Sequence, residues 1–337
     1  MKTLRSLLIL GLVSATADAS VWDRAVARPE DEAARDLYDA KMLEGDTATL
    51  SATIQAASGA HGMESIRRAE AAYRAAAALR PQEAEPYFRI GNLIYQLHFG
   101  CETQIQLPTC ELPYATPARM QVAVDAWDAF EQRAPLDPRV GEILLKRALL
   151  NTKVVSGAPS DRVHLEAAAR DYQAAFDRSD GLNGVRGDEQ LLGNLAETYM
   201  MLGRLDDAIA TYQRAIAAGA ARVSTVYGLA VALDRDGSGA QAARRILMQG
   251  TEGFDSFKRE FIRRTVFFVP EGESNYYFAL ANEAFGYDSA ALEFWNRYVA
   301  SGAHPEFQPR AREHIEQLQK QHVRAERQPA GLDDTNW

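Results

Sequence analysis

Two cysteines, Cys101 and Cys110, are the residues whose spacing most directly indicates a chemistry in this sequence. In an oxidising compartment such a close pair is expected to form a disulfide, which would restrain the segment between them. In the loop-entropy account, a bond of this kind contributes about 2–3 kcal/mol to stability. The alternative is a metal site that includes His98, although two cysteines and one histidine at irregular spacing match no common zinc pattern.

Other patterns that would indicate catalysis are absent from the sequence. It contains no Gly-x-Ser-x-Gly elbow, no His-Glu-x-x-His pair and no Gly-rich phosphate loop. His314 and His322 are eight residues apart, which is two helical turns and too far for joint metal ligation. We therefore expect a protein that is not an enzyme and that needs no cofactor and no metal.

The N-terminus has the pattern of a secretory signal peptide. Lys2 and Arg5 precede an apolar run from Leu7 to Val13, and Ala17 and Ala19 fit a small-x-small cleavage site. The apolar run is too short to span a bilayer, and no cysteine follows it that could carry a lipid anchor. We expect residues 1–19 to be removed and the mature chain to be periplasmic or secreted, without a transmembrane segment. In that setting the cysteine pair should oxidise.

The charge of the chain excludes one class of partner. Removing residues 1–19 takes Lys2, Arg5 and Asp18 from 37 basic and 46 acidic residues, which leaves 35 against 45 and a net charge of −10. An acidic surface repels phosphate backbones, and the sequence has no cluster of Lys and Arg to offset this repulsion. We expect no binding to nucleic acid. The abundance of Ala, Leu, Arg and Glu favours helices.

A period of 34 residues indicates how these helices are organised. Large, small, Gly, small and large residues recur in the same order at this spacing. The first set is Leu195, Ala196, Gly203, Ala208 and Tyr212, and the second is Leu229, Ala230, Gly237, Ala242 and Ile246. A fixed period of this length is typical of stacked helix pairs, because one short pair cannot bury its own apolar face.

Four residues of the first set, with three more, resemble the tetratricopeptide repeat (TPR) consensus. The matching positions are Leu192, Leu195, Ala196, Tyr199, Ala208, Tyr212 and Ala215. Small residues at Ala196 and Ala208 would allow the paired helices to approach closely, and the tyrosines would fill the space around them. The resemblance implies an all-α, right-handed superhelix of helical hairpins, with about six repeats and some insertions.

Weaker copies of the pattern extend over most of the chain and define the expected domains. We expect an N-terminal helical cap at 20–61, a TPR solenoid at 62–306, a closing helix at 307–322 and a disordered tail at 323–337. Within the cap, one helix is predicted from Pro29 to Met42 and another from Thr47 to Ala57.

The resemblance also implies where a partner would bind. In this family the first helix of each repeat lines the concave face, and its exposed positions carry the contacts. Carried over repeat by repeat, these positions are Phe88, Asn92, Tyr95, Gln96, Leu145, Thr152, Lys153, Glu197, Met200, Met201, Tyr227, Val231, Asp234, Arg235, Phe278, Asn282 and Phe285. Aromatic, Met and amide groups suit an extended peptide or a partner helix.

One segment, Thr265 to Gly272, does not fit the repeat. Its β-branched and aromatic residues before Pro270 favour an extended stretch. Phe267 and Phe268 could pin a linker between repeats, or they could form a second contact surface for another protein.

Together these features indicate an exported, non-enzymatic scaffold or adaptor that binds a protein or peptide. In a bacterium it would serve a secretion, pilus or motility complex of the envelope. The alternative is an enzyme, or an enzyme subunit, that acts on cell-wall or secreted substrates in the helical groove. A carboxylate pair with strongly shifted pKa values in a deep pocket would favour the enzyme.

Overall fold

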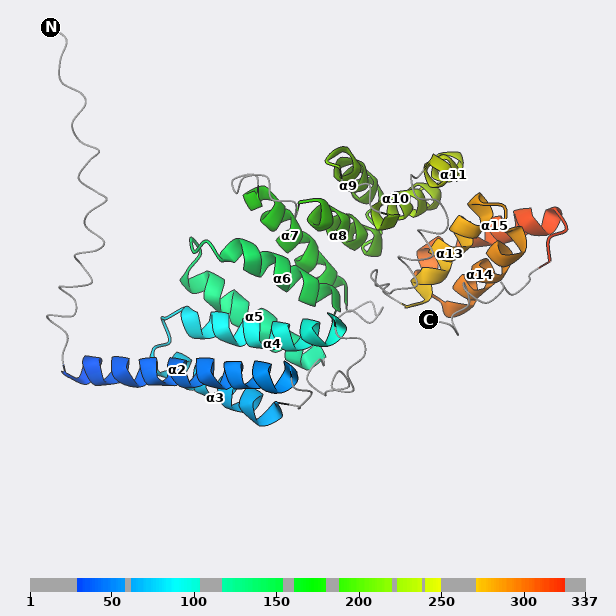
Figure 1. Ribbon diagram of the computed structural model, residues 1–337. Helices are drawn as coiled ribbons and strands as arrows, with labels where there is room; N and C mark the ends of the chain where they lie inside the picture. The colour runs from blue at the N-terminus through cyan, green and yellow to red at the C-terminus, as the bar shows by residue number, and fades with distance from the viewer. Residues whose placement is uncertain are drawn as a thin grey trace, which may run out of the picture. The chain divides into compact units, whose positions relative to one another are not determined.

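The computed structural model describes residues 29–57, 62–103, 117–153, 161–179, 188–219, 223–237, 240–249 and 271–324 (Figure 1). Of these residues 87% are helical and none lies in a strand, so the predicted all-α fold class is confirmed. Residues 1–19, Cys110, Phe267, Phe268 and the tail beyond residue 324 lie outside the described residues. In the part of the chain that is described, no helix combines the length and the apolar character needed to cross a membrane.

The chain divides into two compact units, and the first contains four helices. Unit 1 holds residues up to Ala115 together with Asp125–Pro135, and unit 2 holds the rest. The helices of unit 1 are α2 (Pro29–Ala57), α3 (Met63–Leu79), α4 (Glu85–Thr103) and the greater part of α5 (Pro117–Arg133).

Unit 1 begins with a helical hairpin of α2 and α3, and here one expectation was wrong. The structure has a single helix from Pro29 to Ala57 where two were predicted. Gly45 lies inside this helix and against the ring of Tyr73 in α3, where a Cβ would come within 2.3 Å of the ring. Asp46 accepts a hydrogen bond of 2.7 Å from the Tyr73 hydroxyl. Helix α2 thus packs along α3.

Besides the start of α5, unit 2 contains nine described α-helices. They are α6 (Val140–Lys153), α7 (Arg162–Ser179), α8 (Asp188–Met201), α9 (Leu205–Ala217), α10 (Val223–Arg235), α11 (Ala240–Gln249), α13 (Ser274–Ala284), α14 (Asp288–Ser301) and α15 (Gln308–Lys320). From α6 to α11 and again from α13 to α15, each helix packs against the next one in the chain.

The 34-residue register holds for the first helices and shifts by one residue in the second. Ala196, Ala208 and Ala230 are fully buried, as the register requires. In α11, however, the buried residues are Ala243 and Leu247, and the predicted Ala242 and Ile246 are only partly buried. α9 begins two residues after Gly203, and α11 begins three residues after Gly237. Both glycines have the left-handed backbone, with φ of 71° and 74°, that a turn of this kind requires.

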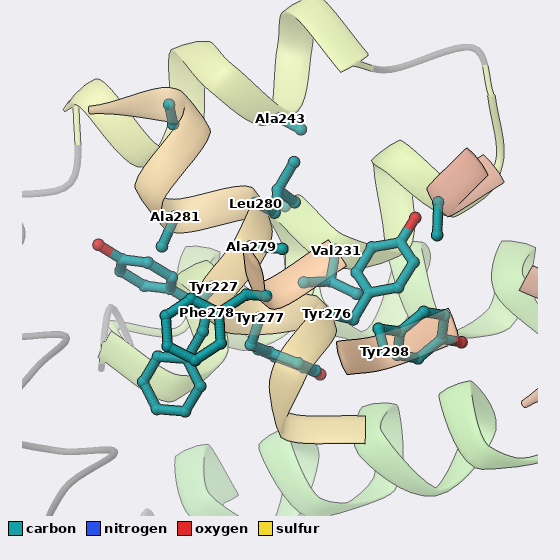
Figure 2. Packing of buried hydrophobic residues seen from close by; sticks show 14 of the residues in the cluster. Tyr227, Val231, Ala243, Tyr276, Tyr277, Phe278, Ala279, Leu280, Ala281 and Tyr298 are labelled. Carbon is teal, nitrogen blue, oxygen red and sulfur yellow. The ribbon is translucent and has the colours of Figure 1, made fainter. Parts of the chain in front are cut away.

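The hydrophobic cluster of unit 2 includes buried side chains of α10, α13 and α14 (Figure 2). The ring of Tyr276 lies edge-on to Trp295 and Tyr298, with centroids 4.7 and 4.9 Å apart. Edge-to-face pairs of this kind add about 0.5–1.5 kcal/mol each beyond the burial of their area. The aromatic side chains thereby fix α14 against α13, and this arrangement positions the polar groups described next.

Candidate functional site: the predicted binding face and a buried ionic network

In unit 1 the predicted binding residues lie on α4 and remain partly accessible. Phe88 and Tyr95 are half-buried, and they contact rings of α5 at centroid distances of 5.4 Å to Phe130 and 5.7 Å to Trp127. Asn92 is also half-buried, and Gln96 is exposed. This face of α4 therefore offers both apolar rings and amide groups at the surface of unit 1.

In unit 2 only part of the predicted face is accessible. The half-buried residues are Leu145, Glu197, Met201 and Phe285. The side chain of Lys153 lies outside the described residues. The remaining predicted residues belong to the core and are Thr152, Met200, Tyr227, Val231, Asp234, Arg235, Phe278 and Asn282. These core residues are not available to a partner in the free protein, which corrects the expectation drawn from the repeat positions.

The physical reason lies in the surroundings of α10. This helix contacts α8, α9, α11 and α13, so it is enclosed on most sides. A first helix of a hairpin presents one open face only when its neighbours leave that face uncovered. The neighbours of α10 leave no such face uncovered. Two of its polar residues, Asp234 and Arg235, form buried ionic interactions instead.

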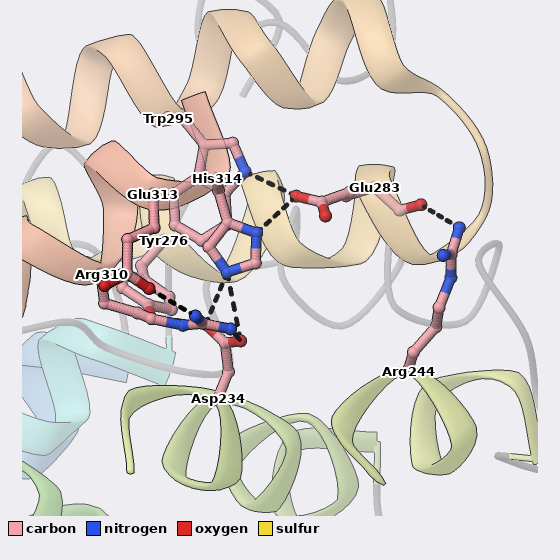
Figure 3. Close-up of polar contacts among 8 residues, drawn as sticks. All are labelled: Asp234, Arg244, Tyr276, Glu283, Trp295, Arg310, Glu313 and His314. Atoms are coloured by element: carbon pink, nitrogen blue, oxygen red, sulfur yellow. Dashed lines mark hydrogen bonds and ion pairs between the residues drawn. The ribbon is translucent and has the colours of Figure 1, made fainter. Parts of the chain in front are cut away.

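Asp234 is the centre of the first of these interactions (Figure 3). Its carboxylate accepts hydrogen bonds from Arg310 at 2.7 Å, from the Tyr276 hydroxyl at 2.7 Å and from Nε2 of His314 at 3.0 Å. The other ring nitrogen of His314, Nδ1, lies 2.9 Å from Oε2 of Glu283. That same carboxylate oxygen accepts a hydrogen bond of 3.0 Å from the indole of Trp295. The network joins α10, α13, α14 and α15.

The two carboxylates keep His314 charged. Burial disfavours the imidazolium, but hydrogen bonds to Asp234 and Glu283 outweigh it and raise the pKa of His314 to about 9. Burial also disfavours the charged form of Asp234 and by itself would raise its pKa. The hydrogen bonds from His314 and Arg310 nevertheless lower the pKa of Asp234 to about 2. Both ring nitrogens of His314 therefore donate hydrogen bonds, and neither has a free lone pair for proton abstraction or metal binding. Within the described residues, no group of three or more His, Cys, Asp and Glu side chains is placed to hold a metal ion.

Arg235 and Glu273 form a second ionic contact in the same region. The guanidinium donates a hydrogen bond of 2.7 Å to the Glu273 carboxylate, and both side chains are buried. The guanidinium carbon also lies over the ring of Tyr276 and over that of Phe307, at 4.4 and 4.3 Å from their centroids. Burial alone would lower the pKa of Arg235, but the charge of Glu273 raises it above its ordinary value. The cation thus joins α10 to the turn before α13.

Glu197 is the predicted binding residue with the most unusual environment. Its carboxylate accepts hydrogen bonds from the hydroxyls of Tyr212 and Tyr277, the latter at 3.2 Å. Burial raises the pKa of Glu197, and the charge of Glu273 acts in the same direction. The surroundings of this carboxyl group therefore favour its protonated form more than water does.

The partners in the ionic network are far apart in the chain, so local spacing does not connect His314 with Asp234 or Glu283. A usable signal was present, since Ala311, His314 and Leu318 lie on one helical stripe and all three are buried. A histidine on an apolar stripe needs a polar partner inside the protein.

Comparison with known proteins gives no further assignment: no protein-family model matches the chain, and no curated protein matches it.

Proposed function

We propose that this protein is an exported, non-enzymatic adaptor built from TPR-type helical hairpins. The first helices of these hairpins bind a protein or peptide partner, and the complex supports the assembly or operation of a machine in the bacterial cell envelope. The signal pattern in residues 1–19 underlies the proposed export, and the repeat register underlies the proposed family.

The observation that carries this proposal is the close approach of helices at small residues. In unit 1 a Cβ on Gly91 would come within 2.2 Å of the Trp127 indole, and in unit 2 a Cβ on Gly228 would come within 2.4 Å of the Tyr212 ring. In both cases an aromatic side chain of one helix occupies the space above a glycine of another. Small-to-aromatic packing of this kind is what the TPR resemblance implies.

The accessible part of the predicted face has the composition of a peptide-binding surface. In unit 1 it presents Phe88, Tyr95 and the amide of Gln96. In unit 2, Leu145 and Met201 are partly accessible on α6 and α8. Rigid aromatic groups and adaptable Met side chains are the residue types that anchor peptides by apolar contact.

Glu197 supports the second candidate function, an enzyme that acts on cell-wall or secreted substrates. Its raised pKa and the nearby charge of Glu273 are features of a general acid. Against this role, two tyrosine hydroxyls occupy its oxygens, and Glu273 is held by Arg235. Glu197→Gln distinguishes the candidates, since an enzyme would lose turnover of peptidoglycan or protein substrates and an adaptor would show no turnover to lose.

The adaptor proposal is tested by capturing the partner and measuring its affinity for single variants. The tagged protein is recovered from its own envelope, the retained partner is identified by mass spectrometry, and its binding is then titrated. Tyr95→Ala probes the face of unit 1 and Met201→Ala probes that of unit 2. Matched controls are Tyr287→Ala and Met248→Ala, because these side chains are 51% and 57% exposed and lie outside the predicted face.

We expect at least one of the two face variants to weaken binding about tenfold or more, because central interface anchors carry most of the binding energy. Both controls should bind as the unmodified protein does. Capture of no partner, or equal losses in face variants and controls, would contradict the proposal.

A further inference from the structure

Helix α2 is apolar on two opposite faces, and only one of them has a partner in the described structure. Tyr38, Gly45, Ala48 and Ala52 lie on the face that packs against α3, and all four are buried. The helix also carries half of the large hydrophobic side chains that are strongly exposed in the described residues.

Three of these exposed side chains form a stripe opposite the buried face. Leu43 is 67% exposed, and Leu50 and Ile54 are each 61% exposed. With Ala40 and Thr47, which are exposed as well, they recur at alternating spacings of three and four residues. This is the spacing of a coiled-coil seam, in which one helix packs along another. We call the five residues the α2 seam.

The other end of the chain shows what a solvent-facing terminal helix looks like in this protein. In α15 the buried residues are Ala311, His314 and Leu318. Apart from Pro309, which lies in the first turn, all exposed residues of α15 are polar, and they include Arg312 and Lys320. Terminal helices of repeat arrays need such a polar outer face to stay soluble. The α2 seam lacks it, so solvent exposure alone does not explain its composition.

We propose that the α2 seam binds the α2 seam of a second copy of this chain, with the two helices antiparallel. The distribution of charge on α2 supports this occupant and this direction. Residues 29–46 contain seven acidic and two basic side chains, whereas residues 47–57 contain no charged side chain at all. A parallel pair would bring the two acidic halves together, but an antiparallel pair places each acidic half beside an uncharged one.

The seam residues occupy the a and d positions of a heptad, with 40, 47 and 54 in one class and 43 and 50 in the other. The antiparallel register follows because a residue of one class then packs opposite a residue of the other class. Leu43 of one copy lies opposite Ile54 of the other, and Thr47 lies opposite Leu50. Residues 44–46 of each copy then lie beside residues 51–53 of the other, so an acidic part of one helix meets an uncharged part of its partner. The seam is thus complementary to itself in its distribution of charge.

One helix from each copy makes a small contact. Interfaces that bury less than about 1,200 Å² in total form weak, transient complexes rather than obligate dimers. We therefore expect a monomer–dimer equilibrium that depends on protein concentration.

Sedimentation of the purified protein over a range of concentrations tests the interface. Leu43→Gln/Leu50→Gln should raise the dimer dissociation constant about a hundredfold, because it removes the central apolar anchors. Leu136→Gln is the matched control, since Leu136 is 96% exposed and lies outside α2. Circular dichroism verifies that the variants stay folded, which is expected because the substituted side chains face solvent. A monomer at every concentration, or a dimer that the double variant leaves intact, overturns the proposal.

Charge exchange tests the direction of the helices. Leu43→Glu and Ile54→Lys should each weaken the dimer as single changes. Combined in one chain they should restore much of the association, because the antiparallel register brings the new carboxylate at position 43 of one copy against the new ammonium group at position 54 of the other. A parallel pair would bring like charges together, so failure of the combined variant to recover overturns the antiparallel arrangement.

Discussion

The charged state of His314 provides the sharpest test of the buried network, through the dependence of stability on pH. The pKa of His314 rises from 6.5 to about 9 on folding. A group whose pKa is raised on folding stabilises the folded state fully below its unfolded pKa, and this contribution is lost as the pH rises through the folded pKa. The contribution should therefore be present below about pH 6.5 and disappear by about pH 9.

The size of the effect follows from the same shift. At 1.36 kcal/mol per pKa unit, the change from 6.5 to about 9 corresponds to about 3 kcal/mol. Asp234 and His314 share one ion pair, so their contributions are not summed. At the acidic end the lowered pKa of Asp234 acts in the opposite direction, and its stabilisation is lost only as the pH falls from 3.8 towards about 2.

The assay is urea unfolding followed by circular dichroism at a series of pH values, for the unmodified protein and for His314→Gln. At neutral pH the variant should be less stable by about 3–5 kcal/mol, because it breaks a buried ion pair, removes the cation beside Glu283 and leaves Asp234 with the Arg310 cation alone. Between about pH 6.5 and pH 9 the unmodified protein should lose about 3 kcal/mol more stability than the variant does. His322→Gln, at an exposed residue, should keep the full slope.

Two results would refute this reasoning. One is the same alkaline slope in the unmodified protein and in His314→Gln. The other is an imidazole resonance of His314 that titrates near 6.5 in the folded protein.

The remaining predictions concern helix packing and the cysteine pair. Gly228→Ala should lower the free energy of unfolding by about 1–3 kcal/mol, because its Cβ would meet the ring of Tyr212 at 2.4 Å. Gly141→Ala, whose Cβ would meet nothing within 4 Å, should leave stability unchanged or raise it by up to about 1 kcal/mol, and equal losses in both would contradict the packing described. Cys101 and Cys110 should resist thiol labelling without reductant in protein exported by its native route, and labelling of both would exclude the disulfide and favour the metal alternative.

Local spacing was sufficient to predict much of the helical framework. Small and large residues at fixed offsets, such as Ala208, Tyr212 and Ala215 in α9, predict buried helix faces because residues three, four and seven apart share one side of a helix. The same reasoning failed at α11, where the buried residue is Ala243 and the predicted Ala242 is only partly buried. An exact repeat of residue types in the sequence therefore does not ensure that the same positions face the core.

The candidate site was less predictable, since its geometry depends on contacts between distant segments. Repeat positions place Asp234 and Tyr227 on a binding face, but the enclosure of α10 by four other helices puts both in the core. The partners of Asp234 come from residues 42 to 80 positions away in the chain. Nothing in a single sequence identifies which arginine or histidine meets a given carboxylate.

The central claim, that the first helices of the hairpins bind a protein partner, is tested most directly by hydrogen exchange on the captured complex. The account predicts that partner binding slows amide exchange in α4, α6 and α8, whereas α7 and α9 exchange as in the free protein. Slowed exchange confined to α7, α9 or residues 265–272, with the first helices unchanged, would contradict it.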